Sequence, residues 1–204
     1  ADAELAKKFA TQAVNHSIGV MTAKDDAAQM SQGAGMTFRN NIEWLAGNYN
    51  EARMGSSIFS YLMGYEDPRL NVYFLPMDGN ASYGVEAFNG KTYQAVPAGH
   101  ANAQNDIYKS CSKPNIQSGT PTYWLRASEV YFLRAEAALV WEGFGSADSW
   151  YKQGIDMSFQ ENGVTEPVDD YMNSNLSPRA YVLSHYQYGQ TLSAPCETTV
   201  KFEG

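Results

Sequence analysis

The sequence has few basic residues. Of its 204 residues, only 14 are Lys or Arg against 22 Asp or Glu, which gives a formal net charge of −8. A protein that binds nucleic acid needs clustered basic side chains to neutralise the phosphates. The composition therefore argues against a nucleic-acid partner.

Long apolar runs are also missing. No stretch is long enough to form a transmembrane helix, and no basic amphipathic stretch indicates a helix at a membrane surface. The sequence shows neither an initiator methionine nor a signal peptide. We expect this chain to be an internal fragment of an exported protein, with any membrane anchor outside it.

Motifs for catalysis and metal binding are absent as well. The three His residues stand apart, and the sequence contains no zinc-binding His pair, no nucleophile elbow and no phosphate-binding glycine loop. The spacing of Asp78, Asn80 and Ser82 resembles a calcium loop, but Tyr83 stands where such a loop needs glycine. The sequence predicts no catalytic residue, no metal site and no cofactor, and a plain turn at Asp78.

There are only two cysteines, Cys111 and Cys196. An even number in an exported protein permits a disulfide, which would close a long loop. Two unpaired thiols are the alternative. Neither neighbourhood has the pattern of a metal site or a nucleophile.

Residues 123–159 have the pattern of a helix, a glycine turn and a second helix. The periodicity predicts antiparallel helices over 127–142 and 147–159, with Gly143 and Gly145 ending the first and Ser146 capping the second. Trp141 and Trp150 are expected in the core, whereas Trp124 would begin the first helix. Contacts are expected through Val130, Leu133, Ala137 and Ile155, with close approach at Ala135, Ala138 and Gly154.

The same segment has the spacing of a tetratricopeptide hairpin. Ala147, Tyr151 and Gly154 match the small and aromatic positions of its second helix. Arg134 occupies a position where that pattern has leucine, and no proline closes the unit. Residues 2–14 are similar to the second helix of an earlier hairpin whose first helix is absent, with an apolar face formed by Ala3, Ala6, Phe9, Ala10, Ala13 and Val14.

The amino-acid sequence of this hairpin resembles that of the SusD/RagB family. The resemblance lies in LRASEVYFLRAEAAL, followed by a glycine turn and A-x3-Y-x2-GI-x2-S. Residues 56–76, with the Asp67-Pro68-Arg69-Leu70 turn, resemble a second block of that family. Residues 83–90 resemble its glycine-bounded loop, although the arginine often found near its start is missing.

The Asp67-Pro68-Arg69-Leu70 turn should also end a helix. Because proline restricts the conformation of the residue before it, a helix over 56–65 should end at or before Asp67. We interpret this turn as structural.

The resemblance implies a surface lipoprotein of Bacteroidetes on the extracellular face of the outer membrane. Such proteins capture nutrients, usually glycans, without catalysis for a TonB-dependent (SusC-like) outer-membrane transporter, which they can close like a lid. A tetratricopeptide-type module that binds a peptide or a partner protein is the alternative. An enzyme that acts on glycans is a third hypothesis.

The expected fold is mainly α, with tetratricopeptide-like helical hairpins and a long irregular, loop-rich excursion. We interpret 1–204 as a single SusD-like domain fragment. Within it, 1–30 would be helical scaffold, 31–122 the excursion, 123–160 the hairpin, and 161–204 a helical or irregular C-terminal part. Turn-forming residues are dense over 79–121.

Candidate ligand-binding residues are Trp44, Tyr49, Tyr83 and Tyr93. Sugar recognition needs flat rings for the apolar faces of pyranoses and polar side chains for their hydroxyl groups. Trp44 lies among several asparagines and Tyr49, and the tyrosines fall in turn-rich segments. The alternative is that these rings anchor the loops onto the helices. The ligand residues of the family vary with the ligand, so the resemblance assigns none here.

Overall fold

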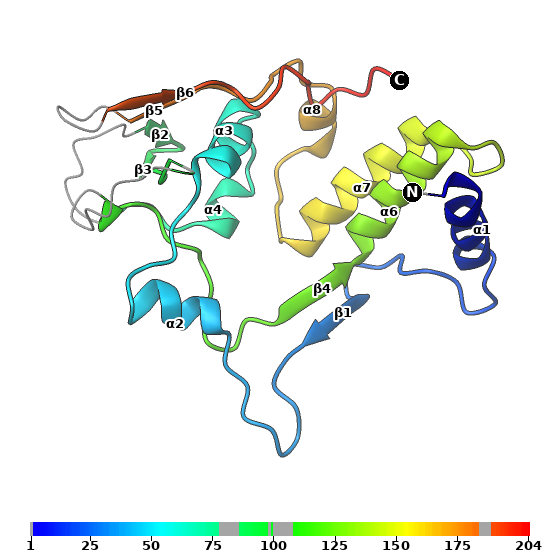
Figure 1. The fold of residues 1–204 in the computed structure, drawn as a ribbon, viewed down its shortest axis with the longest axis horizontal. Helices are drawn as coiled ribbons and strands as arrows, with labels where there is room; N and C mark the ends of the chain where they lie inside the picture. Colours follow the sequence, from blue (N-terminus) through cyan, green and yellow to red (C-terminus); the bar gives the residue numbers. More distant parts are fainter. Residues whose placement is uncertain (1, 78–85, 98, 100–107, 184–188) are drawn as a thin grey trace. The chain divides into compact units, whose positions relative to one another are not determined.

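The computed structural model describes residues 2–77, 86–97, 99, 108–183 and 189–204 (Figure 1). The fold is mainly helical, as predicted, with three two-stranded sheets among the described residues. The helices are α1 (Ala3–Val14), α2 (Asn41–Gly47), α3 (Ser56–Gly64), α4 (Leu70–Tyr73), α6 (Ala127–Val140), α7 (Ala147–Glu161) and α8 (Val168–Met172). The strands are β1 (Ala27–Met30), β2 (Glu86–Phe88), β3 (Lys91–Tyr93), β4 (Thr122–Arg126), β5 (Tyr181–Leu183) and β6 (Gln190–Leu192).

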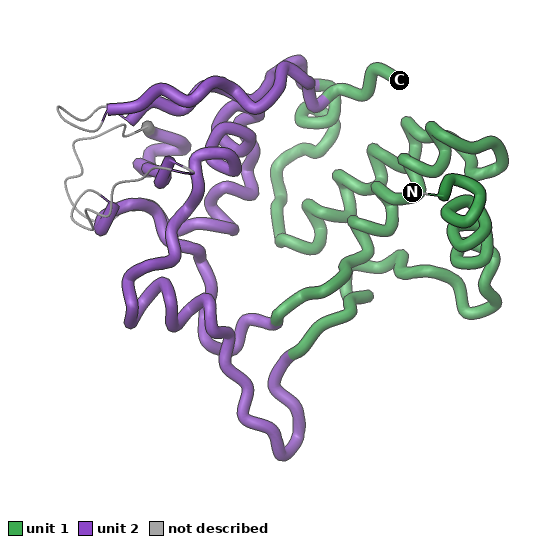
Figure 2. The backbone as a smooth tube through the Cα atoms, in the orientation of Figure 1, with its two compact units in different colours: residues 1–30, 122–173, 201–204 green, residues 31–121, 174–200 purple. Residues whose placement is uncertain are grey.

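The chain divides into two compact units, which Figure 2 distinguishes by colour. Unit 1 comprises residues 1–30, 122–173 and 201–204, and unit 2 comprises 31–121 and 174–200. Each unit is therefore built from segments far apart in the sequence. Within the described ranges, no helix combines the length and the apolar character that crossing a bilayer requires.

In unit 1, α6 and α7 form the predicted antiparallel hairpin and lie side by side (Figure 1). α6 ends at Val140, two residues before the predicted end, because Trp141 turns to an extended conformation. Gly143 and Gly145 adopt left-handed φ angles of 92° and 91° in the connection. Ser146 then caps α7 by accepting a hydrogen bond from the backbone N–H of Ser149 at 3.3 Å.

Small residues allow the two helices to approach closely. A Cβ on Gly154 would lie 2.8 Å from the ring of Phe132, and that ring also packs against Tyr151. The predicted contact of Leu133 within the hairpin is wrong, because this side chain is 58% exposed. Helical periodicity identified an apolar stripe on α6 but could not say which neighbour it faces.

The carboxylate of Glu161, at the end of α7, caps the start of α6. It accepts hydrogen bonds from the backbone N–H of Ser128 at 2.9 Å and from its hydroxyl at 2.6 Å. Arg126 donates to the Glu161 carbonyl at 2.8 Å and pairs with the carboxylate at 3.4 Å. Since Arg126 offers no side-chain cap at the N-terminus of α6, Glu161 satisfies an amide that would otherwise lack an acceptor.

Strand β4 runs directly into α6 and pairs antiparallel with β1, with Ala27 opposite Arg126. The expectation that Trp124 begins a helix is therefore wrong. The segment TYWLR contains aromatic and β-branched residues that favour strands, and β1 supplies the pairing partner. Trp124 is 67% exposed on this strand.

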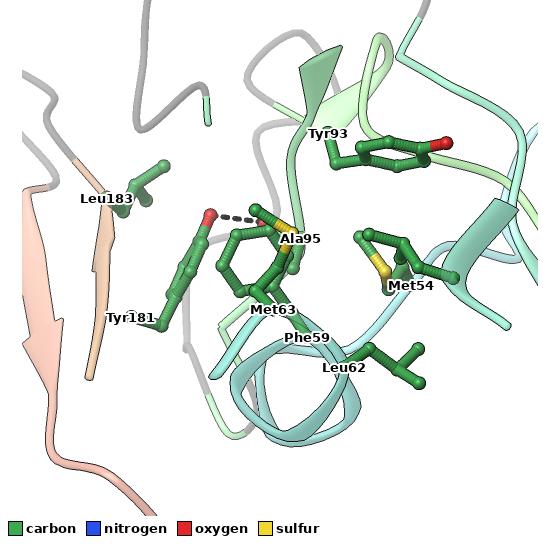
Figure 3. Close-up of a cluster of buried hydrophobic side chains, with 9 residues drawn as sticks. Met54, Phe59, Leu62, Met63, Tyr93, Ala95, Tyr181 and Leu183 are labelled. Carbon is green, nitrogen blue, oxygen red and sulfur yellow. Dashed lines mark hydrogen bonds between the residues drawn. The ribbon is translucent and has the colours of Figure 1, made fainter. Parts of the chain in front are cut away.

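Unit 2 holds a core assembled from α3, β3 and β5 (Figure 3). The rings of Phe59 and Tyr181 meet edge to face at 5.0 Å, and the Tyr181 hydroxyl donates to the Ala95 carbonyl at 2.6 Å. Burial raises the pKa of Tyr181. The buried members of this cluster are Met54, Phe59, Leu62, Met63, Leu70, Tyr93, Ala95, Tyr181 and Leu183.

Two turns position the parts of this core. Asn89 and Gly90 both have positive φ angles, 48° and 74°, and join β2 to β3 as a tight hairpin. α3 ends at Gly64, before Asp67, as predicted. The Asp67 carboxylate accepts hydrogen bonds from the backbone and Nε of Arg69, both at 2.9 Å, which supports a structural role for this turn.

We expect Gly64→Ala to destabilise unit 2 severely. A Cβ there would lie 2.5 Å from the carbonyl oxygen of Ser177 and 2.6 Å from the Cα of Pro178, and these backbone atoms cannot rotate away. Overpacking of this kind costs at least about 1–3 kcal/mol, measurable by chemical denaturation. Gly33→Ala is the control because its Cβ would meet nothing within 4 Å. Equal stability of both variants would contradict the proposed close contact.

The two cysteines are free thiols, so no disulfide joins them. Cys111 is buried, and burial raises the pKa of its thiol to about 12. The pKa of Cys196 is lowered, chiefly by the backbone N–H of Thr198 and also by hydrogen bonds from the Thr198 side chain and the Tyr61 hydroxyl. The Tyr61 oxygen lies 3.7 Å from the Cys196 sulfur.

These environments predict different thiol reactivities. At neutral pH, Cys196 should react rapidly with a disulfide reagent, whereas Cys111 should react only after unfolding. Since a lowered pKa gives more thiolate at a given pH, the labelling rate of Cys196 should reach its half-maximum below the ordinary value of about 8.5. Tyr61→Phe should shift that midpoint upward. Rapid labelling in a Cys196→Ser variant would show that Cys111 is accessible.

Candidate ligand site

A pocket of about 360 Å³ lies in unit 2. Its walls combine rings, an amide and charged groups of both signs, and come from three segments separated in the sequence. They are formed by Tyr49, Asn50, Glu51, Arg53, Val96, Tyr108 and Lys109.

The helix α2 and the turn after it present Tyr49 to this pocket. Asn40 caps α2 by accepting from the backbone N–H of Ile42, and its amide donates to the Thr120 carbonyl at 3.0 Å. After α2 the chain reverses at Asn50, whose φ is 58°. Tyr49 is thereby left 56% exposed, with its ring 4.3 Å from that of Trp44 in an edge-to-face contact.

Arg53 joins the two walls of the pocket. Its guanidinium donates to the carbonyls of Tyr108 at 3.1 Å and Lys109 at 3.0 Å. It also donates to the carbonyl of Ala52 at 2.8 Å and to the side-chain oxygen of Asn50. A planar group with several donors can hold four acceptors at once, so Arg53 fixes the turn against the segment at Tyr108.

The inner part of the pocket rests on the core of unit 2. The backbone of Met54 donates to the Ser112 carbonyl and accepts from the N–H of Val96, both at 2.8 Å. Val96 in turn accepts from the N–H of Ser56 at 2.9 Å. These bonds tie both walls to the start of α3, so the loop residues of the pocket have a rigid support.

The pocket can provide both kinds of contact that a sugar needs. The Tyr49 ring offers an exposed flat face, and Trp44 restricts its movement. The Asn50 amide, the Glu51 carboxylate and the Lys109 ammonium group can donate to or accept from hydroxyl groups. The lining is more polar than that of a typical ligand pocket, in which a few polar groups orient a ligand on a mostly apolar surface.

The structure brings together only part of the predicted ligand-binding set. Tyr49 lines the pocket, and Trp44 contacts the Tyr49 ring without lining the pocket itself. Tyr93 is fully buried, and its hydroxyl donates to the side-chain oxygen of Asn71, so its ring serves the core. Tyr83 lies outside the described residues, as does the calcium-like turn at Asp78.

Of the seven residues that line the pocket, sequence reasoning selected only Tyr49 as a candidate. Glu51 and Arg53 follow Tyr49 closely, and their place in the same short segment was the available signal. Tyr108 and Lys109 reach the pocket only through the tertiary contact with Arg53, for which the sequence carries no local pattern. Within the described residues, no three His, Cys, Asp or Glu side chains gather in a way that could hold a metal ion.

Comparison with known proteins identifies the family. The model of the SusD-like family, described as "Susd and RagB outer membrane lipoprotein", matches residues 1–204. The chain belongs to the SusD-like family. The resemblance inferred from residues 56–76 and 123–159 is thus confirmed. No curated protein matched the sequence.

Solved structures of SusD homologues share the fold of this SusD-like chain. One from Bacteroides thetaiotaomicron is 30% identical with a TM-score of 0.83, over 100% of this chain and 40% of that one. One from Bacteroides vulgatus is 32% identical with a TM-score of 0.81, over 98% and 39%. A chitin-binding homologue from Flavobacterium johnsoniae is 29% identical with a TM-score of 0.82, over 98% and 39%. The chain therefore spans about 40% of the length of these relatives.

We expect Arg53→Leu to open the pocket and destabilise unit 2. The substitution removes the donors that hold the carbonyls of Tyr108 and Lys109, and hydrogen bonds to a charged group contribute about 1.5–3 kcal/mol each. Denaturant unfolding should show a loss of at least about 2 kcal/mol. The control Arg39→Leu removes an exposed i,i+4 ion pair with Glu43 and should cost under about 1 kcal/mol. Equal losses would contradict the structural role of Arg53.

Proposed function

We propose that this chain is part of a cell-surface protein that captures glycans without chemical change and passes them to an outer-membrane transporter. The observation that carries the proposal is the exposed Tyr49 ring, held by Trp44 at a pocket of mixed polarity. Membership of the SusD-like family supports it. The chitin-binding relative supports a glycan as the ligand.

The proposal places the parent protein on the extracellular face of the outer membrane. The description of the family as an outer-membrane lipoprotein supports this location. The proposed partner is a TonB-dependent transporter, which would receive the glycan that this protein releases. The role is binding alone, so ligand should leave the pocket with its glycosidic bonds intact.

Calorimetry on the full-length parent protein tests the site. Glycans of different composition, chitin oligosaccharides among them, are titrated first to find a ligand. Tyr49→Ala should then weaken binding roughly tenfold, or ~1.4 kcal/mol, because a stacking face is lost. Its melting temperature should change little, since the ring is 56% exposed.

Two variants serve as controls. Tyr123→Ala removes a ring that is 42% exposed on β4 and outside the pocket, so affinity should stay unchanged. Tyr93→Ala removes a buried ring and should cost about 3–5 kcal/mol of stability. Unchanged glycan affinity in Tyr49→Ala would rule out this pocket as the binding site. Binding of peptides, with no glycan bound, would favour a protein-interaction module. Shortened glycan products would contradict a role in binding alone.

A further inference from the structure

The chain contains two Asn-Gly pairs, Asn89-Gly90 and Asn162-Gly163. An asparagine followed by glycine is prone to a reaction within the backbone, because glycine has no side chain to hinder access to its nitrogen. In this reaction the glycine nitrogen attacks the side-chain amide carbon of the asparagine, and a five-membered succinimide ring forms. Both pairs have the same two residues, so their structural surroundings decide which of them can react.

The first pair lies at an exposed turn of unit 2. Asn89 and Gly90 are the two residues between β2 and β3, and both are exposed. Within the described part of the chain, the Asn89 side chain has no hydrogen-bond partner and the Gly90 N–H has no acceptor. A Cβ built on Gly90 would meet nothing within 4 Å, so the space around this backbone is open. Neither reacting group is therefore held back by a neighbour.

This turn can open without unfolding unit 2. Attack on the side chain requires rotation about the Cα–C bond of Asn89, which has to leave its turn conformation. The φ of Asn89 is 48°, in the left-handed region that residues other than glycine occupy at a cost, so leaving it relieves strain. β2 and β3 pair over only three residues each, and the turn is at the end away from the buried Tyr93. A ribbon this short is marginally stable, and its free end opens at low cost in free energy.

The second pair is held at the end of α7 in unit 1. The side-chain amide of Asn162 donates to the Ser158 carbonyl at 2.7 Å, and the backbone N–H of Asn162 donates to the same carbonyl at 3.2 Å. The N–H of Gly163 donates to the Gln160 carbonyl at 3.3 Å. The nitrogen that would leave and the nitrogen that would attack are thus both hydrogen-bonded to the last turn of a long helix. Reaction here requires that helix end to unwind first.

We propose that Asn89 is a site of spontaneous deamidation in the folded protein and that Asn162 is protected from it. A bond forms between the Gly90 nitrogen and Cγ of Asn89, and the bond from Cγ to the side-chain nitrogen breaks. That nitrogen leaves as ammonia with the proton that the Gly90 nitrogen loses. Water then adds to either carbonyl of the succinimide and opens the ring to aspartate or isoaspartate, with no oxidation or reduction.

Modification at this turn acts on the support of the candidate ligand site. Either product adds one negative charge to the formal net charge of −8. Isoaspartate also adds a methylene group to the main chain between β2 and β3. From β3 the chain runs through the buried Tyr93 to Val96 in the wall of the pocket. The inference itself does not depend on which ligand the protein captures.

Ageing of the purified full-length parent protein in mildly alkaline buffer tests this proposal. Peptide mapping by mass spectrometry follows both Asn-Gly pairs in the same sample, so Asn162 is the internal control. We expect Asn89 to convert at least tenfold faster than Asn162, a difference of about 1.4 kcal/mol in activation free energy. The products should include isoaspartate, and the rate should rise with pH because the attacking nitrogen must lose its proton. Asn89→Gln should remove most of the acidic species that ion exchange separates, since glutamine would have to form a larger ring.

The same measurement in guanidinium chloride separates structure from sequence. Once the protein is unfolded, both pairs should convert at similar rates, because the hydrogen bonds around Asn162 and Gly163 are lost. A difference that persists in denaturant would show that the neighbouring residues set the rates, and it would overturn the structural argument. Equal rates in the folded protein, or faster conversion of Asn162, would overturn the proposal directly, as would an Asn89 that stays unmodified while the unfolded chain reacts. Circular dichroism before and after ageing verifies that the protein remains folded.

Discussion

The buried carboxylate of Glu161 is the interaction on which unit 1 depends most. It joins the last turn of α7 to the first turn of α6 and also pairs with Arg126, so one side chain holds three elements: both helices and the end of β4. Because the carboxylate is almost fully shielded from water, its hydrogen bonds cannot be replaced by solvent. The orientation of β4, and of β1 paired with it, follows from this closure.

Unit 2 uses a different principle to position its pocket. The residues available to a ligand lie on turns, but these turns are bonded to the segments that enter the core at Met54 and Val96. Arg53 supplies the connection by binding carbonyls on the opposite wall. A loop site on a rigid support can vary in its exposed residues without disturbing the core.

Local signals in the sequence were sufficient for most helices, because caps, glycines and periodicity act over a few residues. The α6–α7 hairpin and the end of α3 before Asp67 were predicted in this way. The partner of an apolar stripe depends on tertiary structure, and the prediction for Leu133 was therefore wrong. The same reason explains why Tyr49 is exposed and Tyr93 is buried although both were candidates, since composition cannot distinguish an exposed ring from a buried one. The Asn89-Gly90 turn did carry a recognisable hairpin signal, which the emphasis on irregular structure in this segment overlooked.

The discontinuity of unit 2 has a consequence for biosynthesis. Its core needs Tyr181 and Leu183 from β5, yet the rest of that core is made much earlier, before the whole of the α6–α7 hairpin. A nascent chain that has reached Val140 therefore exposes Phe59 and its neighbours without the ring that covers them. Unit 2 cannot close until β5 has left the ribosome, so its apolar residues stay uncovered for longer than those of a contiguous domain.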